Sequence, residues 1–186
     1  MLYFVNSGSH LQTSKMETAK KPVITSGAHQ GQSLSVAGGN YRILISGKET
    51  DGEFATIEML VPPGGGPGPH AHAGFQESFY VVEGEVEVQS EDGIYTAGQG
   101  AYIVIPRGGI VHGFKNKSGN MAKLLCVVVP SGLEEMFLEL GVPVAEGEFL
   151  PPPVIDDAMK KKMQDLAEKY GQKMYPPDYF TKSAKE

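Results

Sequence analysis

The sequence contains no tryptophan and only one cysteine, Cys126. A lone cysteine excludes an internal disulfide, and its position in the apolar run LLCVVVP predicts a buried packing thiol that suits a reducing compartment. No apolar run approaches the roughly 20 residues of a membrane-spanning helix. The first residues also lack the basic start and long apolar core of a secretory signal. We therefore expect a cytoplasmic protein that does not cross a membrane.

Blocks of basic residues are absent as well. The formal net charge is -6, and no cluster of lysine or arginine offsets it. Such a composition does not favour nucleic acid or an anionic membrane as a partner, so we expect a small-molecule ligand or substrate. At 186 residues, the chain is long enough to bury the core of one domain with some extension.

Short runs of β-branched and aromatic residues dominate the middle of the chain. Gly and Pro separate them at intervals typical of an antiparallel sandwich or barrel. The sequence thus predicts an all-β barrel over residues 32–130, after an arm or tail at 1–31 and before a helical extension at 131–186. The expected strands lie in YRILISG, FATIEMLVPP, SFYVVEGEVEVQS, GIYTAG, GAYIVIPRG, GFKNK and AKLLCVVVP.

Two segments between these runs carry clear turn or loop chemistry. The tract EGEVEVQSEDGIYTAGQG alternates apolar and acidic residues around Glu91, Asp92 and Gly93, which predicts a hairpin with one wet face. The stretch 62–70 is too rich in Pro and Gly for a strand, so it predicts a loop that leads to His70 at the mouth of the barrel.

Two helices are predicted after residue 130. Over residues 133–140, apolar side chains recur at helical spacing, and Gly141 is placed as a C-terminal cap. The second helix begins at Asp156 or Asp157 and ends at Gly171. Its apolar stripe comprises Ile155, Met159, Met163, Leu166 and Tyr170. Such a stripe is typical of a surface helix that packs on a barrel or a second subunit, and a lid over a ligand is the alternative.

The segment PHAHAGFQESFYVVEG collects residues that bind metals. His70 and His72 are two residues apart, so they lie on the same face of an extended strand. Glu77 has the wrong parity for that face, but a bend at 73–74 lets its carboxylate join the imidazoles. His112 follows on a separate predicted strand. Three imidazoles with one carboxylate predict a site for one divalent transition metal, and Fe, Mn, Ni, Cu and Zn all suit these ligands.

The spacing of these residues resembles the two motifs of the cupin superfamily. The first motif, His-x-His, four residues, Glu, six residues and Gly, is similar to the run from His70 to Gly84. The second motif is similar to Gly100, Pro106, Gly108, His112 and Asn116, with the histidine one residue late. The chain also resembles bacterial cupins related to quercetin 2,3-dioxygenase in its phrases LEEMFLELG and KYG. This resemblance implies a cupin-type jelly-roll barrel with C-terminal helices, but no particular substrate.

Strand parity predicts an apolar, partly aromatic pocket beside the metal. The residues that share the parity of Glu77 or His112 are Phe79, Val81, Ile110 and Phe114. Ordinary core filling is the alternative role for the two phenylalanines. No lysine or arginine falls on this face, which disfavours a sugar phosphate and favours a neutral or phenolic substrate.

These observations favour a metal-dependent oxidoreductase, most concretely a quercetinase-like dioxygenase that acts on a phenolic or flavonoid-like small molecule. Glu77 is the expected catalytic proton acceptor, and a plain ligand role is its alternative. The protein could instead be a non-catalytic binding or sensing cupin whose metal only holds the barrel together. It could also be a metal-assisted isomerase or lyase, which would work without dioxygen.

The resemblance also implies association, because small cupin barrels commonly pair. We expect a homodimer in which the arm at 1–31 helps to cover exposed edges of the barrel.

Overall fold

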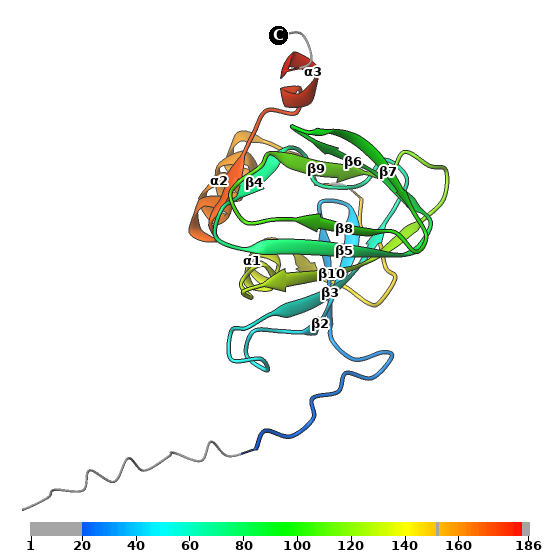
Figure 1. The fold of residues 1–186 in the computed structure, drawn as a ribbon, viewed down its shortest axis with the longest axis vertical. Coiled ribbons are helices and arrows are strands. Elements are labelled where there is room, and N and C mark those ends of the chain that lie inside the picture. Colours follow the sequence, from blue (N-terminus) through cyan, green and yellow to red (C-terminus); the bar gives the residue numbers. More distant parts are fainter. Residues whose placement is uncertain (1–19, 152, 184–186) are drawn as a thin grey trace, which may run out of the picture.

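The computed structural model describes residues 20–151 and 153–183, and within them two antiparallel sheets face each other as a jelly roll (Figure 1). In pairing order, the seven-stranded sheet contains β11 (Val142–Pro143), β1 (Gln32–Val36), β2 (Gly39–Ile45), β3 (Ala55–Val61), β10 (Ala122–Val129), β5 (Gln76–Glu83) and β8 (Tyr102–Ile105). The five-stranded sheet contains β12 (Gln172–Met174), β4 (His70–His72), β9 (His112–Lys115), β6 (Glu85–Ser90) and β7 (Gly93–Gly98). The predicted all-β class is confirmed.

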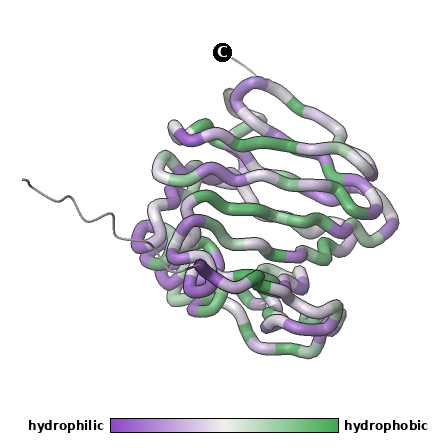
Figure 2. The backbone as a smooth tube through the Cα atoms, turned by 60° about the horizontal axis from the view of Figure 1, so that its bottom comes forward, coloured by the Kyte–Doolittle hydropathy of each residue, from purple (hydrophilic) through white to green (hydrophobic). Residues whose placement is uncertain are grey.

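The central strands of the larger sheet show why the sequence forms this fold. Along β3 and β10, buried and half-buried residues alternate, because successive side chains of a strand point to opposite faces. The inward set fills the space between the sheets. It includes Leu34, Ile57, Val81, Leu124 and Cys126, each with no exposed surface. Figure 2 shows the same arrangement, with hydrophobic residues along the stacked strands and hydrophilic residues at many of the turns.

The predicted turns lie where the sequence placed them. Strands β6 and β7 pair from Glu85 and Gly98 down to Ser90 and Gly93, so Glu91 and Asp92 form a tight hairpin turn. Residues 62–69 form the expected loop before β4. Cys126 is buried in β10, as its apolar surroundings predicted.

Three helices occur in the described part of the chain, namely α1 (Leu133–Leu140), α2 (Asp157–Lys169) and the short α3 (Tyr179–Ser183). The side chain of Asp156 caps α2 by accepting a hydrogen bond from the backbone N–H of Met159, at 2.8 Å. Gly171 follows α2 with a φ of 72°, a left-handed conformation that glycine adopts without strain.

Gly141 caps the end of α1 as predicted, and its N–H donates to the carbonyl oxygen of Phe137. Its backbone is extended, with a φ of -78° and a ψ of 162°. A Cβ atom at this position would lie 2.8 Å from the carbonyl oxygen of Phe137 and 3.0 Å from Val36. Close packing of the helix end against β1 therefore selects glycine here.

The segment after residue 130 contributes strands as well as helices, which the sequence did not predict. Strand β11 pairs with β1 at one end of the larger sheet, and β12 pairs with β4 at one end of the smaller sheet. Helix α2 lies beside β4 on the outside of the barrel (Figure 1). The domain boundary at residue 130 stays a prediction, and most of the arm at 1–31 lies outside the described residues. Among the described helices, none is long and apolar enough to span a membrane.

Candidate metal centre

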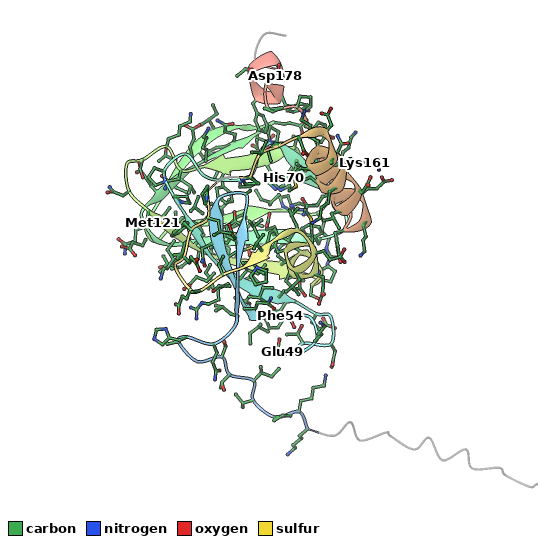
Figure 3. All side chains as sticks on the ribbon, turned by 180° about the vertical axis from the view of Figure 1, so that it is seen from behind. Glu49, Phe54, His70, Met121, Lys161 and Asp178 are labelled. Carbon is green, nitrogen blue, oxygen red and sulfur yellow. The ribbon has the colours of Figure 1, made fainter. Side chains whose placement is uncertain are left out.

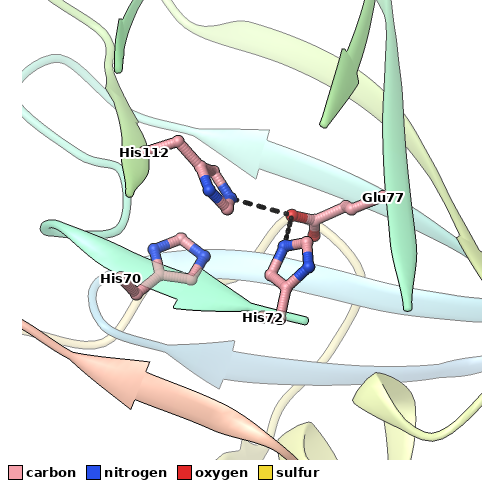
Figure 4. A group of neighbouring side chains, drawn as sticks. All are labelled: His70, His72, Glu77 and His112. Atoms are coloured by element: carbon pink, nitrogen blue, oxygen red, sulfur yellow. Dashed lines mark ion pairs between the residues drawn. The ribbon is translucent and has the colours of Figure 1, made fainter. Parts of the chain in front are cut away.

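The four predicted ligands come from both sheets of the barrel. His70 and His72 project from the same face of β4, and His112 begins β9, where it stands directly opposite His70 in the antiparallel register. Glu77 belongs to β5 in the facing sheet, and Figure 4 shows its carboxylate pointing across the barrel toward the imidazoles. The four side chains converge because the chain crosses from the smaller sheet to the larger sheet between His72 and Glu77.

The bend after His72 carries the chain from one sheet to the other. Gly108 and Gly109 support it from the adjacent turn, and the N–H of Gly108 donates to the carbonyl oxygen of Ala73 at 3.3 Å. Both glycines have a positive φ, of 120° and 84°, which other residues adopt only with strain. This turn accommodates the extra residue that delays His112 in the second motif.

The ligand atoms converge closely. One nitrogen from each histidine and one oxygen from Glu77 all lie within 4.8 Å of one another, and all four residues are buried. Oε2 of Glu77 lies 3.4 Å from Nε2 of His72 and 3.7 Å from Nε2 of His112. The rings of His70 and His112 approach to 4.3 Å between their centroids.

Backbone carbonyls orient each of the three imidazoles. Nδ1 lies 2.9 Å from the carbonyl oxygen of Gly68 in His70, 3.0 Å from that of Phe75 in His72, and 3.0 Å from that of Ile110 in His112. Because a carbonyl can only accept, each Nδ1 carries the proton. Nε2 of each neutral ring is then the atom with the free lone pair, as in histidines that ligate metals.

The Nε2 atoms of His72 and His112 have no hydrogen-bond partner among the described residues, although both atoms are buried. An unpaired buried nitrogen is unfavourable unless a ligand satisfies it. Oε2 of Glu77 lies 3.4 and 3.7 Å from these nitrogens, but it carries no proton to donate and so satisfies neither of them. Three nitrogen donors and one carboxylate oxygen at this spacing fit a divalent transition metal.

The electrostatics of the metal-free site favour the protonation states that ligands need. Burial, together with the neighbouring His112, lowers the pKa of His70 from 6.5 to about 4. Burial alone would raise the pKa of Glu77, but the surrounding imidazoles outweigh it and lower this pKa from 4.5 to about 2. At neutral pH, His70 is therefore neutral and Glu77 is ionised.

A family model described as "Cupin domain" matches residues 57–128, which span all four of these side chains. This chain carries a cupin domain. Quercetin 2,3-dioxygenase from Bacillus subtilis is 30% identical over 122 residues, which cover 66% of this chain and 35% of that enzyme. The cupin chain thus aligns with about a third of the length of this relative.

Solved structures show the same fold. KdgF from Halomonas sp. superposes with a TM-score of 0.53 at 18% identity, over 61% of this cupin and 99% of that chain. A predicted oxalate decarboxylase from Thermotoga maritima gives a TM-score of 0.51 at 22% identity, over 59% of this chain and 99% of its own. At these identities the likeness concerns the fold alone.

Residues whose identity the two cupin motifs do not specify complete the surroundings of the ligands. The thiol of Cys126 lies 3.5 Å from Oε1 of Glu77 and can donate to it, while Oε2 faces the imidazoles. The ring of Phe75 stacks on His72, with centroids 4.0 Å apart. Cys126 was predicted only as a packing residue. Its place beside Glu77 follows from the neighbouring strands β5 and β10, a pairing that the local sequence does not reveal.

A cavity of about 140 Å³ adjoins the ligand cluster at His70 and Glu77. Its walls are mostly apolar and include no lysine or arginine, in agreement with the character predicted from parity. Of the predicted pocket residues, Phe114 lines the cavity, but Phe79, Val81 and Ile110 do not. Phe79 and Val81 lie in the core between the sheets, and the ring of Phe79 meets that of Phe114 edge-on.

Part of the remaining cavity wall comes from residues after 130 that the sequence did not connect with the site. Helix α1 contributes Leu133, Met136, Phe137 and Leu140, and the following elements contribute Met163, Gln172 and Met174. The apolar periodicity of the helices was visible in the sequence, but the surface against which they pack was not. Their packing on the mouth of the barrel makes the cavity narrow.

Proposed function

We propose that this cupin is a metal-dependent oxidoreductase, most concretely a dioxygenase that acts on a small phenolic molecule. One observation carries the proposal. Two buried imidazole nitrogens without partners, the imidazole of His70 and an ionised carboxylate face one another, and an apolar cavity opens onto the cluster at His70 and Glu77. The similarity to a protein named quercetin 2,3-dioxygenase supports the same class of reaction.

The residues of the site divide the work in a definite way. His70, His72, Glu77 and His112 would hold one divalent metal through three nitrogens and one oxygen. When bound, the metal supplies an open coordination position for an oxygen atom of the substrate and for dioxygen. The apolar walls of the cavity exclude water and hold the ring of the substrate against His70 and Glu77.

Glu77 has two possible roles, proton acceptor and metal ligand, and its pKa helps to choose between them. Because it is ionised at neutral pH and lines the cavity, it can accept a proton from a phenolic hydroxyl. Its pKa of about 2 in the metal-free protein is far below the value of an efficient general base at neutral pH, however. The ligand role is therefore the better supported of the two.

Metal analysis by plasma mass spectrometry tests the proposal first, on the wild type and on a variant with His70→Ala and His112→Ala. We expect near-stoichiometric Fe, Mn, Ni or Cu in the wild type and its loss in the double variant. A matched control is His29→Ala, because His29 is exposed and pairs with Glu146 away from the site. Oxygen uptake with phenolic substrates should then depend on His112.

Other outcomes would redirect the assignment. Protein that neither contains nor takes up divalent metal would contradict the oxidoreductase and favour a non-catalytic binding cupin. Turnover that survives strict anaerobiosis would favour a metal-assisted isomerase or lyase.

A homodimer in the cytoplasm completes the proposal. The described residues support a partner surface at β8, an end strand of the larger sheet, where Tyr102 and Val104 are 62% and 48% exposed. Sedimentation of the full chain and of a variant that begins at Met16 tests both the dimer and the contribution of the arm. An unchanged dimer in the shortened protein would exclude residues 1–15 from the interface.

A further inference from the structure

We propose that the strap formed by α2 and β12, residues 157–174, limits the metal-site cavity to ligands with a single aromatic ring. This inference rests on the proposed function and narrows its substrate class from phenolic or flavonoid-like compounds to one-ring phenols. The cavity measures about 140 Å³. An apolar protein cavity of about 150 Å³ accepts benzene, whereas sites for drug-sized molecules begin at about 300 Å³. A three-ring flavonoid exceeds the space.

The strap forms the part of the cavity wall that lies beside the histidine strand β4. Met163 from α2 lines the cavity, as do Gln172 and Met174 from β12. In the pairing of β12 with β4, Gln172 stands opposite His72 and Met174 stands opposite His70. The strap thus pairs directly with β4, the strand that carries His70 and His72. Its side chains limit how far a molecule bound at His70 can extend in this direction.

Contacts on both sides hold the strap in place. The N–H of Tyr175 continues the strand pairing by donating to the carbonyl oxygen of Pro69 at 2.9 Å. At the end of α2, Lys169 and Tyr170 both bind the carboxylate of Glu139 on α1. Leu166 is buried against the core on the inner side of the helix. Because these contacts tie the strap both to the start of β4 and to α1, the strap is a fixed wall of the cavity.

The chemistry of the lining selects the kind of ring. Apart from His70, Glu77 and Gln172, the side chains that face the cavity are apolar or those of Tyr41, and four of them are methionines, Met59, Met136, Met163 and Met174. Thioether and aromatic groups make favourable contacts with an aromatic face. Among the residues that the structure describes, no cationic side chain lines the cavity to fix a phosphate or a second carboxylate. A ring with oxygen substituents directed at His70 and Glu77 matches this distribution.

The two outer methionines provide the means to test the limit. Met163 is half-buried and Met174 is 37% exposed, so truncating them enlarges the mouth without opening the core. Met121 offers a matched control, since it is 38% exposed and lies on the opposite side of the barrel from α2 (Figure 3). It does not line the cavity.

The experiment measures binding of catechol, 2,3-dihydroxynaphthalene and quercetin, which contain one ring, two fused rings and three rings. Ligand-observed NMR and calorimetry follow each probe with the metal-free protein and with the Zn²⁺-loaded protein, in which no oxidation occurs. We expect the wild type to bind catechol at least about tenfold more tightly than either larger probe. A variant with Met163→Ala and Met174→Ala should reduce this ratio about tenfold. Met121→Ala should leave it unchanged.

Three results would overturn the size limit. They are binding of quercetin by the wild type as tightly as catechol, a ratio that the double methionine variant does not alter, and no binding of catechol in either state of the protein. The size ratio in the metal-free protein depends on the cavity alone. A failure to bind metal would therefore remove the proposed function while leaving the size limit to be judged on that ratio.

Discussion

The carboxylate of Glu77 and the two imidazoles of β4 meet at one point, but the strands that carry them differ in how extensively they pair with their neighbours. Strand β5, which carries Glu77, spans Gln76–Glu83 and pairs along its length with β10 on one side and, over half of it, with β8 on the other. Strand β4 has three residues, meets β9 only where His70 faces His112, and relies on β12 for its other edge. The carboxylate is therefore held by a continuous ladder.

The imidazoles are held by other means. Their Nδ1 atoms bind backbone carbonyls, and the turn with Gly108 and Gly109 supports the bend beside them. Regions with few ladder bonds open more readily than central strands do. The comparison teaches that the site joins a rigid half to a half that depends on turns and on the strap.

The largest effect expected from this contrast is a loss of stability of the metal-free protein in acid, in two steps. The pKa of His70 is about 4 in the folded protein, against 6.5 for the free group. At a pH between these values, His70 is protonated in the unfolded chain but not in the folded protein. Stability then falls as pH falls through this window, by up to about 3 kcal/mol. The stabilisation from Glu77 is present above pH 4.5 and is lost as pH falls toward 2, by a similar amount.

Urea unfolding of the metal-free protein between pH 7 and pH 3 would measure these steps. His70→Asn should flatten the upper step and Glu77→Gln the lower one, which separates the two halves of the site. A free energy of unfolding that is constant from pH 7 to pH 4 would contradict the upper step.

A slightly smaller effect should distinguish the two strands in hydrogen exchange. In the metal-free protein, the backbone amides of 70–72 should exchange at least about tenfold faster than those of 76–83, because β4 opens locally. Zn²⁺ at a hundred times its dissociation constant should slow exchange in 70–72 by up to about 100-fold, equivalent to about 2.7 kcal/mol, since opening releases the metal. Mass spectrometry of peptides from the two segments measures both rates. Equal exchange in the metal-free protein would show that the turns hold β4 as firmly as the ladder holds β5.

The smallest effect concerns the rigid half. Cys126→Val removes the thiol that approaches Oε1 of Glu77, and the affinity for Zn²⁺ should fall about tenfold, or about 1.4 kcal/mol. Cys126→Ser keeps a donor and should lose less. Chelator competition measures both, with Leu124→Val as a control that alters the same face of β10 at a side chain with no donor for the carboxylate. Unchanged affinity in Cys126→Val would show that the β5 backbone alone positions Glu77.

The sequence alone predicted the fold class and the four candidate ligands, the first from local patterns and the second from local patterns together with the spacing of the two cupin-like motifs. Alternation with a period of two placed the strands, and His-x-His necessarily presents both rings on one face. The bend after His72 was predictable because Ala73 and Gly74 offer little resistance to it. These features require only neighbours in the chain, whereas His112 joined the prediction through its place in the second cupin-like motif.

Other features depended on residues far apart in the chain. Strand β12 has the sequence QKM, whose three residues show no alternation strong enough to predict a strand. It forms a strand because β4 presents an open edge to it. For the same reason, Phe114 alone of the four predicted pocket residues lines the cavity, since α1 and the strap supply a large part of its wall. Tertiary pairing decided these positions, and local preference did not.

The pairing of β12 with β4 also sets the order in which the site can be completed during synthesis. The ribosome delivers all four ligand residues by His112, whereas β12, the second partner of β4, follows only with Gln172–Met174. Chains fold from the N-terminal side as they emerge, and pairings across long sequence separations form late. A nascent chain therefore leaves one edge of its histidine strand unpaired until α2 and β12 arrive, and the wall that they add to the cavity can form only after all four ligand residues have emerged.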